Sequence, residues 1–436
     1  MLPHHPLKTD ADLDPLLAAI GDARVVLLGE ASHGTHEYYT WRTALSKRLI
    51  QEKGFHFMAV EGDWPACFEV NAAIKKGRPQ AGGSAAELLQ VFNRWPTWMW
   101  SNWEVAALVD WLYQLNSCRL PADKIGFYGL DVYSLWESLQ EVLRYVTQQG
   151  DGAVATAHRA FKCFEPYSDD PQEYARAVAF VSKDCEAEVT RLLADLRQQV
   201  NQHPRTSGLP IRETDFAAEQ NGLVAVNAER YYRAMLQGGA ASWNVRDRHM
   251  METLQRLLDL YGPGSKAIIW EHNTHIGDAR FTSMRREGEV NVGQLAREQL
   301  GREEVFAVGF GSYQGSVLAG RRWDDQPRVM TVPEAPRGTW EHRLHTELGG
   351  ENALLLSSEL RGQPGLDAPI GHRAIGVVYR PEFEQFGNYV PSIIPDRYDA
   401  FMYLDQTQAL HPLPTADSNG LNGFRRYAPG GADYAS

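Results

Sequence analysis

The chain has 436 residues, of which 43% are hydrophobic and 22% charged, so it can bury a sizeable core. Its formal net charge of −12 argues against a nucleic-acid partner, because phosphate binding depends on clustered lysine and arginine. No apolar run reaches the length of a membrane span, and the start MLPHHPLKTDADLD lacks the basic and apolar regions of a signal peptide. We therefore expect a cytoplasmic protein with no membrane partner that acts on a neutral or hydrophobic small molecule, in an oligomeric state that composition leaves open.

The four cysteines show neither a C-x-x-C pair nor a compact spacing; they stand at positions 67, 118, 163 and 185. This pattern argues against disulfide bonds and against a thiolate zinc site. It agrees with a reducing compartment.

The first third of the chain alternates strand and helix patterns. An apolar strand at 24–28 leads into the sequence GEASHGTH, and apolar residues at helical spacing then predict a helix over 36–53. A second strand at 55–60 ends in EGDW. A tryptophan-rich stretch precedes a helix over 103–116, and a third strand follows at 124–130.

From 136 to 260 the strand signal disappears and amphipathic helices replace it, interrupted by a polar loop at 201–210. This stretch is predicted to be a helical insertion that covers the cleft of a discontinuous α/β core. The core is assigned to residues 1–135 and 261–413, and residues 414–436 form a C-terminal tail.

Strand patterns return at 266–270, 305–310, 374–379 and 400–405. Strands made of Val, Ile and Leu without polar alternation are typical of a parallel sheet that is covered on both faces. The predicted fold class is therefore α/β, with a mainly parallel central sheet flanked by helices and a large helical insertion.

Polar residues follow four of these strands at the point where each one ends. They are Glu30, Glu61, Asp131 and the pair Glu271 and His272. If the strands are parallel neighbours, these side chains meet at one edge of the sheet, where open α/β sheets bind ligands. Carboxylates crowded there repel one another unless cations are interleaved. The nearby sequence supplies His33, His36, Arg42, His272 and His275.

Each of these residues also has a purely structural interpretation. His33 can cap the following helix, Glu30 and Glu61 can interact with helix dipoles, and Arg42 can form a salt bridge to a strand-end carboxylate. The spacing E-x-x-H in a glycine-flanked loop, matched by H-x-x-H at another strand end, favours a functional site over these alternatives.

Other polar positions are assigned structural roles. His36 and Asp131 are interpreted as structural rather than catalytic, and the tryptophans of 95–103 as core or as a rim over the cleft, with a substrate-stacking wall as the alternative. Arg246 and Asp247 are expected to tie the helical insertion to the core.

Three mechanisms are consistent with this residue set. A histidine can take a proton from water near neutral pH when a carboxylate orients it, and a cation can stabilise the developing oxyanion. Histidines and carboxylates together can instead bind zinc or manganese, which would activate water directly. A serine nucleophile is disfavoured because the chain has no G-x-S-x-G sequence, and because Ser32 adjoins His33, where neighbouring side chains point apart.

Three ordered motifs resemble those of the erythromycin esterase family, which includes macrolide-lactone hydrolases and uncharacterised homologues. They are GEASHGTHEYYTWR, AVEGDW and IIWEHNTHIG, and the likeness extends to the late YDAFMYLDQT. The resemblance implies a hydrolase in which His33 is the general base that activates water, without a metal, cofactor or covalent intermediate.

The remaining site positions of the family match Glu30, Arg42, Glu61, His272 and His275. Of these, Arg42 and one of the two histidines are expected to face the carbonyl oxygen. One departure is visible, because Glu271 precedes the H-N-x-H motif where many relatives have a small residue.

The expected function is thus hydrolysis of an ester or macrolactone by His-activated water. The alternatives are a metal-dependent hydrolase on the same site, and a non-catalytic protein that binds a hydrophobic small molecule. The sequence carries no signal for the substrate itself, because specificity lies in loops and in the helical insertion.

Overall fold

The computed structural model describes residues 2–77, 83–150, 153–167, 174, 176–177, 184–202 and 212–414. Within these residues it contains a nine-stranded sheet and a separate two-stranded sheet. The strands are β1 (His5–Pro6), β2 (Val25–Leu28), β3 (Phe57–Asp63), β4 (Gly126–Asp131), β5 (Ala267–Trp270), β6 (Val305–Ala319), β7 (Arg328–Val332), β8 (Ala353–Leu356), β9 (Ile370–Arg373), β10 (Tyr389–Ser392) and β11 (Ala400–Thr407).

The large sheet has the order β1-β8-β11-β6-β2-β5-β3-β4, with β7 paired to β6 off this path. All neighbours from β11 to β4 are parallel. The strands β1, β7 and β8 pair antiparallel. The predicted α/β fold with a mainly parallel central sheet is therefore confirmed, and β2, β5, β3 and β4 do lie side by side with their carboxyl ends at one edge.

Alternate residues of the central strands pack on opposite faces of the sheet. Val26 and Leu28 join one apolar core, and Val25 and Leu27 join the other. The first core is covered by α1 (Asp14–Ile20), α2 (His36–Glu52), α3 (Trp64–Lys76), α4 (Ala85–Leu88) and α5 (Trp103–Ser117). The second is covered by α11 (Ala240–Tyr261), α14 (Val292–Leu300) and α15 (Trp340–Leu348). Both faces are thus apolar, which is why these strands show no polar alternation.

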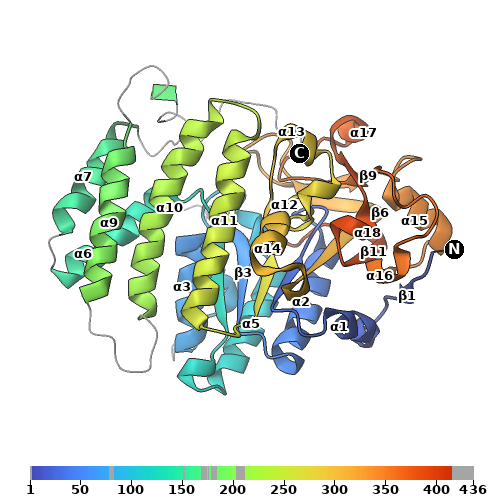
Figure 1. Ribbon diagram of the computed structural model, residues 1–436, viewed down its shortest axis with the longest axis horizontal. Helices are drawn as coiled ribbons and strands as arrows, with labels where there is room; N and C mark the ends of the chain where they lie inside the picture. The colour runs from blue at the N-terminus through green and yellow to red at the C-terminus, as the bar shows by residue number, and fades with distance from the viewer. Residues whose placement is uncertain are drawn as a thin grey trace.

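The helices between β4 and β5 pack around a core of their own, beyond the β4 edge of the sheet (Figure 1). They are α6 (Leu135–Gln149), α7 (Val154–Phe164), α9 (Glu186–Gln202) and α10 (Glu213–Met235). The helix α11 connects this group to the sheet, because it contacts both α10 and β4. Among the described helices, none combines the length and the apolar character that a membrane-spanning segment needs.

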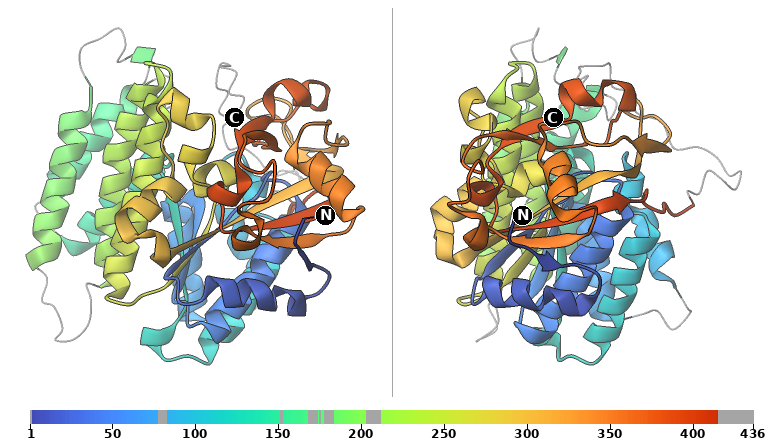
Figure 2. Two further views of the ribbon diagram at one scale, coloured as in Figure 1. Left: turned by 45° about the vertical axis from the view of Figure 1, so that its right-hand side comes forward. Right: turned by 90° about the vertical axis from the view of Figure 1, so that its right-hand side faces the viewer.

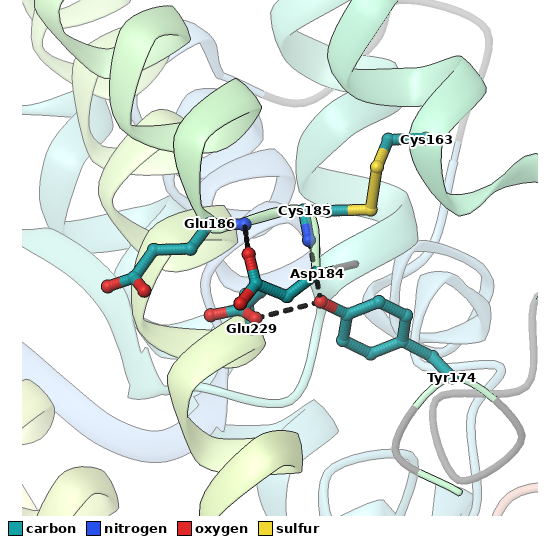
Figure 3. The surroundings of a disulfide bond; sticks show 6 residues. All are labelled: Cys163, Tyr174, Asp184, Cys185, Glu186 and Glu229. Carbon is teal, nitrogen blue, oxygen red and sulfur yellow. Dashed lines mark hydrogen bonds between the residues drawn. A yellow bond between two sulfur atoms is a disulfide. The ribbon is translucent and has the colours of Figure 1, made fainter. Parts of the chain in front are cut away.

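Cys163 and Cys185 form a disulfide bond, so the expectation of no disulfide is wrong. The bond joins the end of α7 to the residue before α9 (Figure 3). Beside it, the Tyr174 hydroxyl donates to Glu229 (2.8 Å) and accepts from the backbone N–H of Cys185 (3.0 Å). Residues far apart in sequence can meet in a helical bundle, so cysteine spacing alone does not reveal such a pair. The remaining cysteines, Cys67 and Cys118, are free.

The C-terminal part of the chain differs from its prediction in several segments. Residues 374–379 are not a strand: Ile375 and Val378 make only isolated bridges, to Ser32 and Gly320. The segment is apolar because Ile375 and Tyr379 fill a small core against β6 and β7. The strands β7, β8, β9 and β10 were not predicted. Short helices complete the fold: α12 (Asn273–Ile276), α13 (Met284–Glu287), α16 (Ser357–Leu360), α17 (Glu384–Gly387) and α18 (Ile394–Arg397).

The last described residues return to the N-terminal half of the chain. Figure 2 shows C-terminal segments, in red, beside N-terminal segments, in blue. The Gly34 carbonyl accepts hydrogen bonds from the N–H groups of Leu318 and Leu410, both at 2.9 Å. The predicted loop 201–210, apart from its first two residues, and the predicted tail, apart from Pro414, lie outside the described residues.

The close approach of Gly34 to β6 gives a test of the fold. A Cβ atom at Gly34 would lie 1.9 Å from the backbone oxygen of Leu318, which neither backbone can relieve without moving. We expect Gly34→Ala to lower the free energy of unfolding by about 1–3 kcal/mol, measured by urea denaturation. Gly376→Ala is the matched control, because nothing lies within 4 Å of its Cβ position; it should change the free energy by less than about 0.5 kcal/mol. Equal effects at the two positions would contradict this packing.

Candidate active site

The loop after β2 places a histidine and a glutamate in contact. Nδ1 of His33 lies 2.9 Å from Oε1 of Glu30, and both side chains are buried. The other carboxylate oxygen, Oε2, accepts from Nη2 of Arg42 at 2.5 Å. Because an ionised carboxylate only accepts, Nδ1 of His33 carries the proton and Nε2 keeps its lone pair. Glu30 therefore fixes both the orientation and the tautomer of His33.

Arg42 lies behind Glu30 rather than at the surface of the site. Its side chain is 0% exposed, and its guanidinium lies 4.5 Å from the ring centres of both Tyr39 and Trp270. The sequence led us to expect that Arg42 faces the carbonyl oxygen of a substrate. A guanidinium enclosed in this way cannot do so. It instead supplies the positive charge that accompanies Glu30 in the core.

At the ends of β3 and β4, one arginine joins two carboxylates. Arg246 of α11 donates to Glu61 (2.7 Å) and makes a two-point contact with Asp131 (3.0 and 2.7 Å). Its Nη1 also donates to Nε2 of His275 at 2.9 Å. The guanidinium lies 4.8 Å from the ring centre of Tyr133. Burial raises the pKa of Glu61, but His275 and Arg246 outweigh burial and hold that pKa well below its usual range.

His275 is bound at both ring nitrogens. Nδ1 lies 2.9 Å from Asp247, and Nε2 receives the bond from Arg246. The ring also stacks on Trp243, with centroids 4.5 Å apart. His275 therefore belongs to the framework that holds Arg246, and neither of its nitrogens is left for a substrate.

His272 has one ring nitrogen with no well-formed hydrogen bond among the described residues. Its Nδ1 lies 2.8 Å from the Thr274 hydroxyl and accepts the backbone N–H of Thr274 at 3.3 Å. Its own backbone N–H donates to Glu61 at 2.8 Å. Burial and the nearby His33 hold the pKa of His272 well below 6.5, so the ring is neutral. A neutral ring that accepts at Nδ1 carries its proton at Nε2, which is buried and makes no well-formed hydrogen bond among the described residues. The backbone of Ala31 interacts with the ring and partly offsets the lowering of its pKa.

The two histidines with available nitrogens lie next to each other. The ring centroids of His33 and His272 are 4.9 Å apart. Burial lowers the pKa of His33, but the carboxylates of Glu61 and Glu30 outweigh burial and raise it above 6.5. The edge of the sheet thus presents a basic nitrogen beside an N–H donor, which is a combination that can activate water and bind an oxyanion.

Among the described residues, one group brings three His or carboxylate ligand atoms within 4.8 Å of one another, and it consists of His36, Glu104 and His411. Ser32 is hydrogen-bonded to Thr35 through its hydroxyl. It has no contact with the ring of His33 of the kind that a nucleophile needs from its base.

The six residues predicted from the motifs form two hydrogen-bonded groups at one edge of the sheet. The first contains Glu30, His33 and Arg42, and the second contains Glu61, His272 and His275. Arg246 and Asp247 connect the helical part to the sheet, as expected, but they also lie within the second group. Sequence reasoning placed them outside the site because α11 is remote in the chain and no spacing relates it to a strand end.

Tryptophans of the segment 95–103 pack beneath the site. Trp98 and Trp100 are buried, and the indole N–H of Trp100 donates to the Glu61 carbonyl at 3.0 Å. This agrees with the interpretation of the segment as core. Trp103 is 54% exposed and lies away from that core.

Glu271 is buried beside these groups with both carboxylate oxygens unpartnered among the described residues. Burial, together with the negative charges of Glu61 and Asp247, raises its pKa well above 4.5. The side chain is therefore a neutral carboxylic acid in the folded protein, whereas it ionises freely in the unfolded chain.

This difference makes Glu271 a source of pH-dependent instability. A raised pKa in the folded state gives a contribution to stability that is complete below about pH 4.5 and is lost as pH rises. We expect Glu271→Gln, which keeps the shape without the ionisation, to raise the melting temperature at pH 7.5 and to leave it nearly unchanged at pH 4.5. Thermal denaturation at the two pH values measures this. An equal shift at both values would show that ionisation is not involved.

Comparisons with known proteins agree with the fold and the motifs. The family model for erythromycin esterase matches residues 50–407, a range that begins after the loop of Glu30 and His33. An erythromycin esterase type II of Escherichia coli is 23% identical over 333 residues, which are 72% of this chain and 75% of that protein.

Two solved structures share the fold. That of a succinoglycan biosynthesis protein has a TM-score of 0.75 at 21% identity and covers 94% of this chain and 95% of that chain. That of a mutant of erythromycin esterase EreC in its open conformation has a TM-score of 0.67 at 14% identity and covers 93% and 98%. With a family model that spans most of its length, the chain belongs to the erythromycin esterase family, and this membership supports an esterase-like hydrolase.

Proposed function

We propose that the protein hydrolyses a carboxylic ester or lactone with water activated by His33. The observation that carries the proposal is the adjacent placement of two complementary nitrogens, on rings whose centroids are 4.9 Å apart. Nε2 of His33 is a base that the bond to Glu30 leaves available, and Nε2–H of neutral His272 is a buried donor without a well-formed hydrogen bond among the described residues. Ester hydrolysis requires both functions.

In the first step, a water molecule attacks the carbonyl carbon while its proton passes to Nε2 of His33. The imidazolium that forms is stabilised by Glu30, whose carboxylate already accepts from Nδ1 at 2.9 Å. Arg42 holds Glu30 in place from behind. Because these partners are in position before the reaction, little reorganisation accompanies the proton transfer.

The negative charge that develops on the carbonyl oxygen then needs a donor. The Nε2–H of His272 is suited to this, because it is buried and makes no well-formed hydrogen bond among the described residues. When the tetrahedral intermediate collapses, the C–O bond to the leaving group breaks and the proton on His33 passes to the departing alkoxide. The products are a carboxylic acid and an alcohol, which remain joined in one molecule when the substrate is a lactone.

A macrolide lactone is the first substrate to test, because the E. coli relative is named for erythromycin. Such a reaction would inactivate the antibiotic and thereby give resistance to it. Simple lactones and aryl esters test the broader reaction class separately from the macrolide.

His33→Ala should abolish turnover. Removing a general base of this kind lowers kcat by about 10²–10⁴-fold. The measurement is mass spectrometry of substrate incubated with wild type and variant, in which hydrolysis adds the mass of one water.

Ser32→Ala is the matched control, because it changes the adjacent residue and removes only the contact with Thr35. It should retain activity within a few-fold. Equal loss in both variants would contradict the proposed role of His33. Loss of activity in EDTA-treated wild type that remains folded, restored by zinc or manganese, would support the metal-dependent alternative. Binding of substrate without turnover, unchanged in His33→Ala, would support a binding protein.

The pH dependence of kcat/KM gives an independent test of the base. His33 must be neutral to accept a proton, and its pKa is raised above 6.5 by Glu61 and Glu30 against the effect of burial. We therefore expect activity to rise with pH through an acidic limb that lies above 6.5. Glu61→Gln removes the larger of the two raising charges, so the limb should move to lower pH.

The same profile recorded for Gly376→Ala provides the reference for unrelated substitutions. An acidic limb below 6.5 in the wild type, or one that stays in place or moves to higher pH in Glu61→Gln, would contradict the assignment of His33 as the titrating base.

A further inference from the structure

A second cluster of ionisable side chains lies outside the strand-end groups. His36 is the first residue of α2, Glu104 lies in the first turn of α5, and His411 lies in the last described segment. Nδ1 of His36 and Nδ1 of His411 lie 2.5 and 2.6 Å from the same oxygen of Glu104, Oε1. Three segments that are distant in sequence thus bring three potential ligand atoms within 4.8 Å of one another.

Glu104 is incompletely satisfied as it stands. Its side chain is 4% exposed, and its second oxygen, Oε2, is buried without a hydrogen-bond partner among the described residues. A buried carboxylate oxygen that lacks a partner has a substantial desolvation cost. Two imidazoles lie close to Oε1, whereas Oε2 has no well-formed hydrogen bond among the described residues. A cation bound to the carboxylate would relieve the crowding at Oε1 and give Oε2 a partner.

The backbone positions of the ligands are fixed independently of their side chains. The His36 N–H donates to the Gln408 carbonyl, and the Trp103 N–H donates to the His411 carbonyl, both at 2.9 Å. Bridges between Thr35 and Ala409 and between Asn102 and Pro412 flank these contacts. A ligand set attached to rigid backbone loses little conformational freedom when an ion binds.

From these contacts we propose that His36, Glu104 and His411 bind a divalent transition-metal ion of the zinc class. Two imidazole nitrogens and one carboxylate oxygen form a ligand set that suits Zn²⁺. The two imidazole nitrogens lie 2.5 and 2.6 Å from Oε1 of Glu104. Ligand atoms of a tetrahedral zinc site lie about 3.3 Å apart, so each nitrogen has to move away from that oxygen by about 0.7–0.8 Å. The side chains of His36 and His411 are 32% and 57% exposed, which leaves room for that movement and for a water molecule as the fourth ligand.

The position of the cluster defines what the ion would do. It would join the loop of GEASHGTH, helix α5 and the C-terminal segment at one point. None of its three residues belongs to the two hydrogen-bonded groups at the strand ends, so the ion would stabilise the fold around the base loop without contacting the reacting atoms.

The test uses the full chain without an affinity tag, stripped with EDTA and then dialysed. Titration with Zn²⁺ in a calorimeter should show one equivalent bound per chain, and one equivalent of Zn²⁺ should raise the melting temperature by several degrees. Titration with Co²⁺ should give the visible absorption bands of a site with imidazole and carboxylate ligands.

Glu104→Gln and His411→Ala should each weaken Zn²⁺ binding by more than about 10-fold. His345→Ala is the matched control, because His345 also bonds a carboxylate, Asp405 (2.7 Å), but without a third ligand. His33→Ala separates this site from the strand-end histidines. Both controls should bind as the wild type does.

Two results would overturn the proposal. One is the absence of Zn²⁺ binding to the wild-type chain at micromolar concentration. This measurement does not depend on the folding of any variant. The other is binding that persists in Glu104→Gln and His411→Ala, or that is lost in His33→Ala, since either would place the ion elsewhere.

Discussion

The arrangement at the carboxyl edge of the sheet depends on the guanidinium of Arg246, whose side chain is 12% exposed. Parallel strands deliver Glu61 and Asp131 to the same place, and two carboxylates with no cation between them would repel each other strongly. Arg246 contacts both of them and also His275, so one charge from α11 holds together residues from β3, β4 and the segment after β5. Removing it would leave two carboxylates unbalanced in a buried setting, which is far more costly than losing a surface ion pair.

The same network determines which atoms are left for chemistry. Glu30 and Arg42 occupy one side of His33, and Thr274 occupies one nitrogen of His272. His275 is occupied on both sides. The proposed chemistry uses two of the groups that these bonds leave available, an acceptor nitrogen of His33 and a donor nitrogen of His272 on neighbouring rings.

The sequence predicts the strand ends well because helices cover both faces of the sheet, so the central strands are apolar throughout and are easy to recognise. Apolar runs followed by polar residues locate Glu30, Glu61 and His272 without any knowledge of the topology. Arg246 is different, because a helix packs beside a strand end through tertiary contacts that no local spacing encodes. The same limit on sequence-based prediction applies to the disulfide, to segment 374–379 with its isolated bridges, and to the contact between His36 and His411. Each depends on segments that come together only in three dimensions.

The central position of β2 has a consequence for the order in which the protein folds. This strand is made near the start of synthesis, yet its two neighbours are β5 and β6, from the second half of the chain. Until those strands emerge, an apolar strand has both edges open, whereas α6 to α10 can pack through contacts within their own stretch. Pairings so remote in sequence are slow to form, and open strand edges favour aggregation. A ribosome-bound fragment that ends before β5 should therefore depend on chaperones while its helical part is already compact.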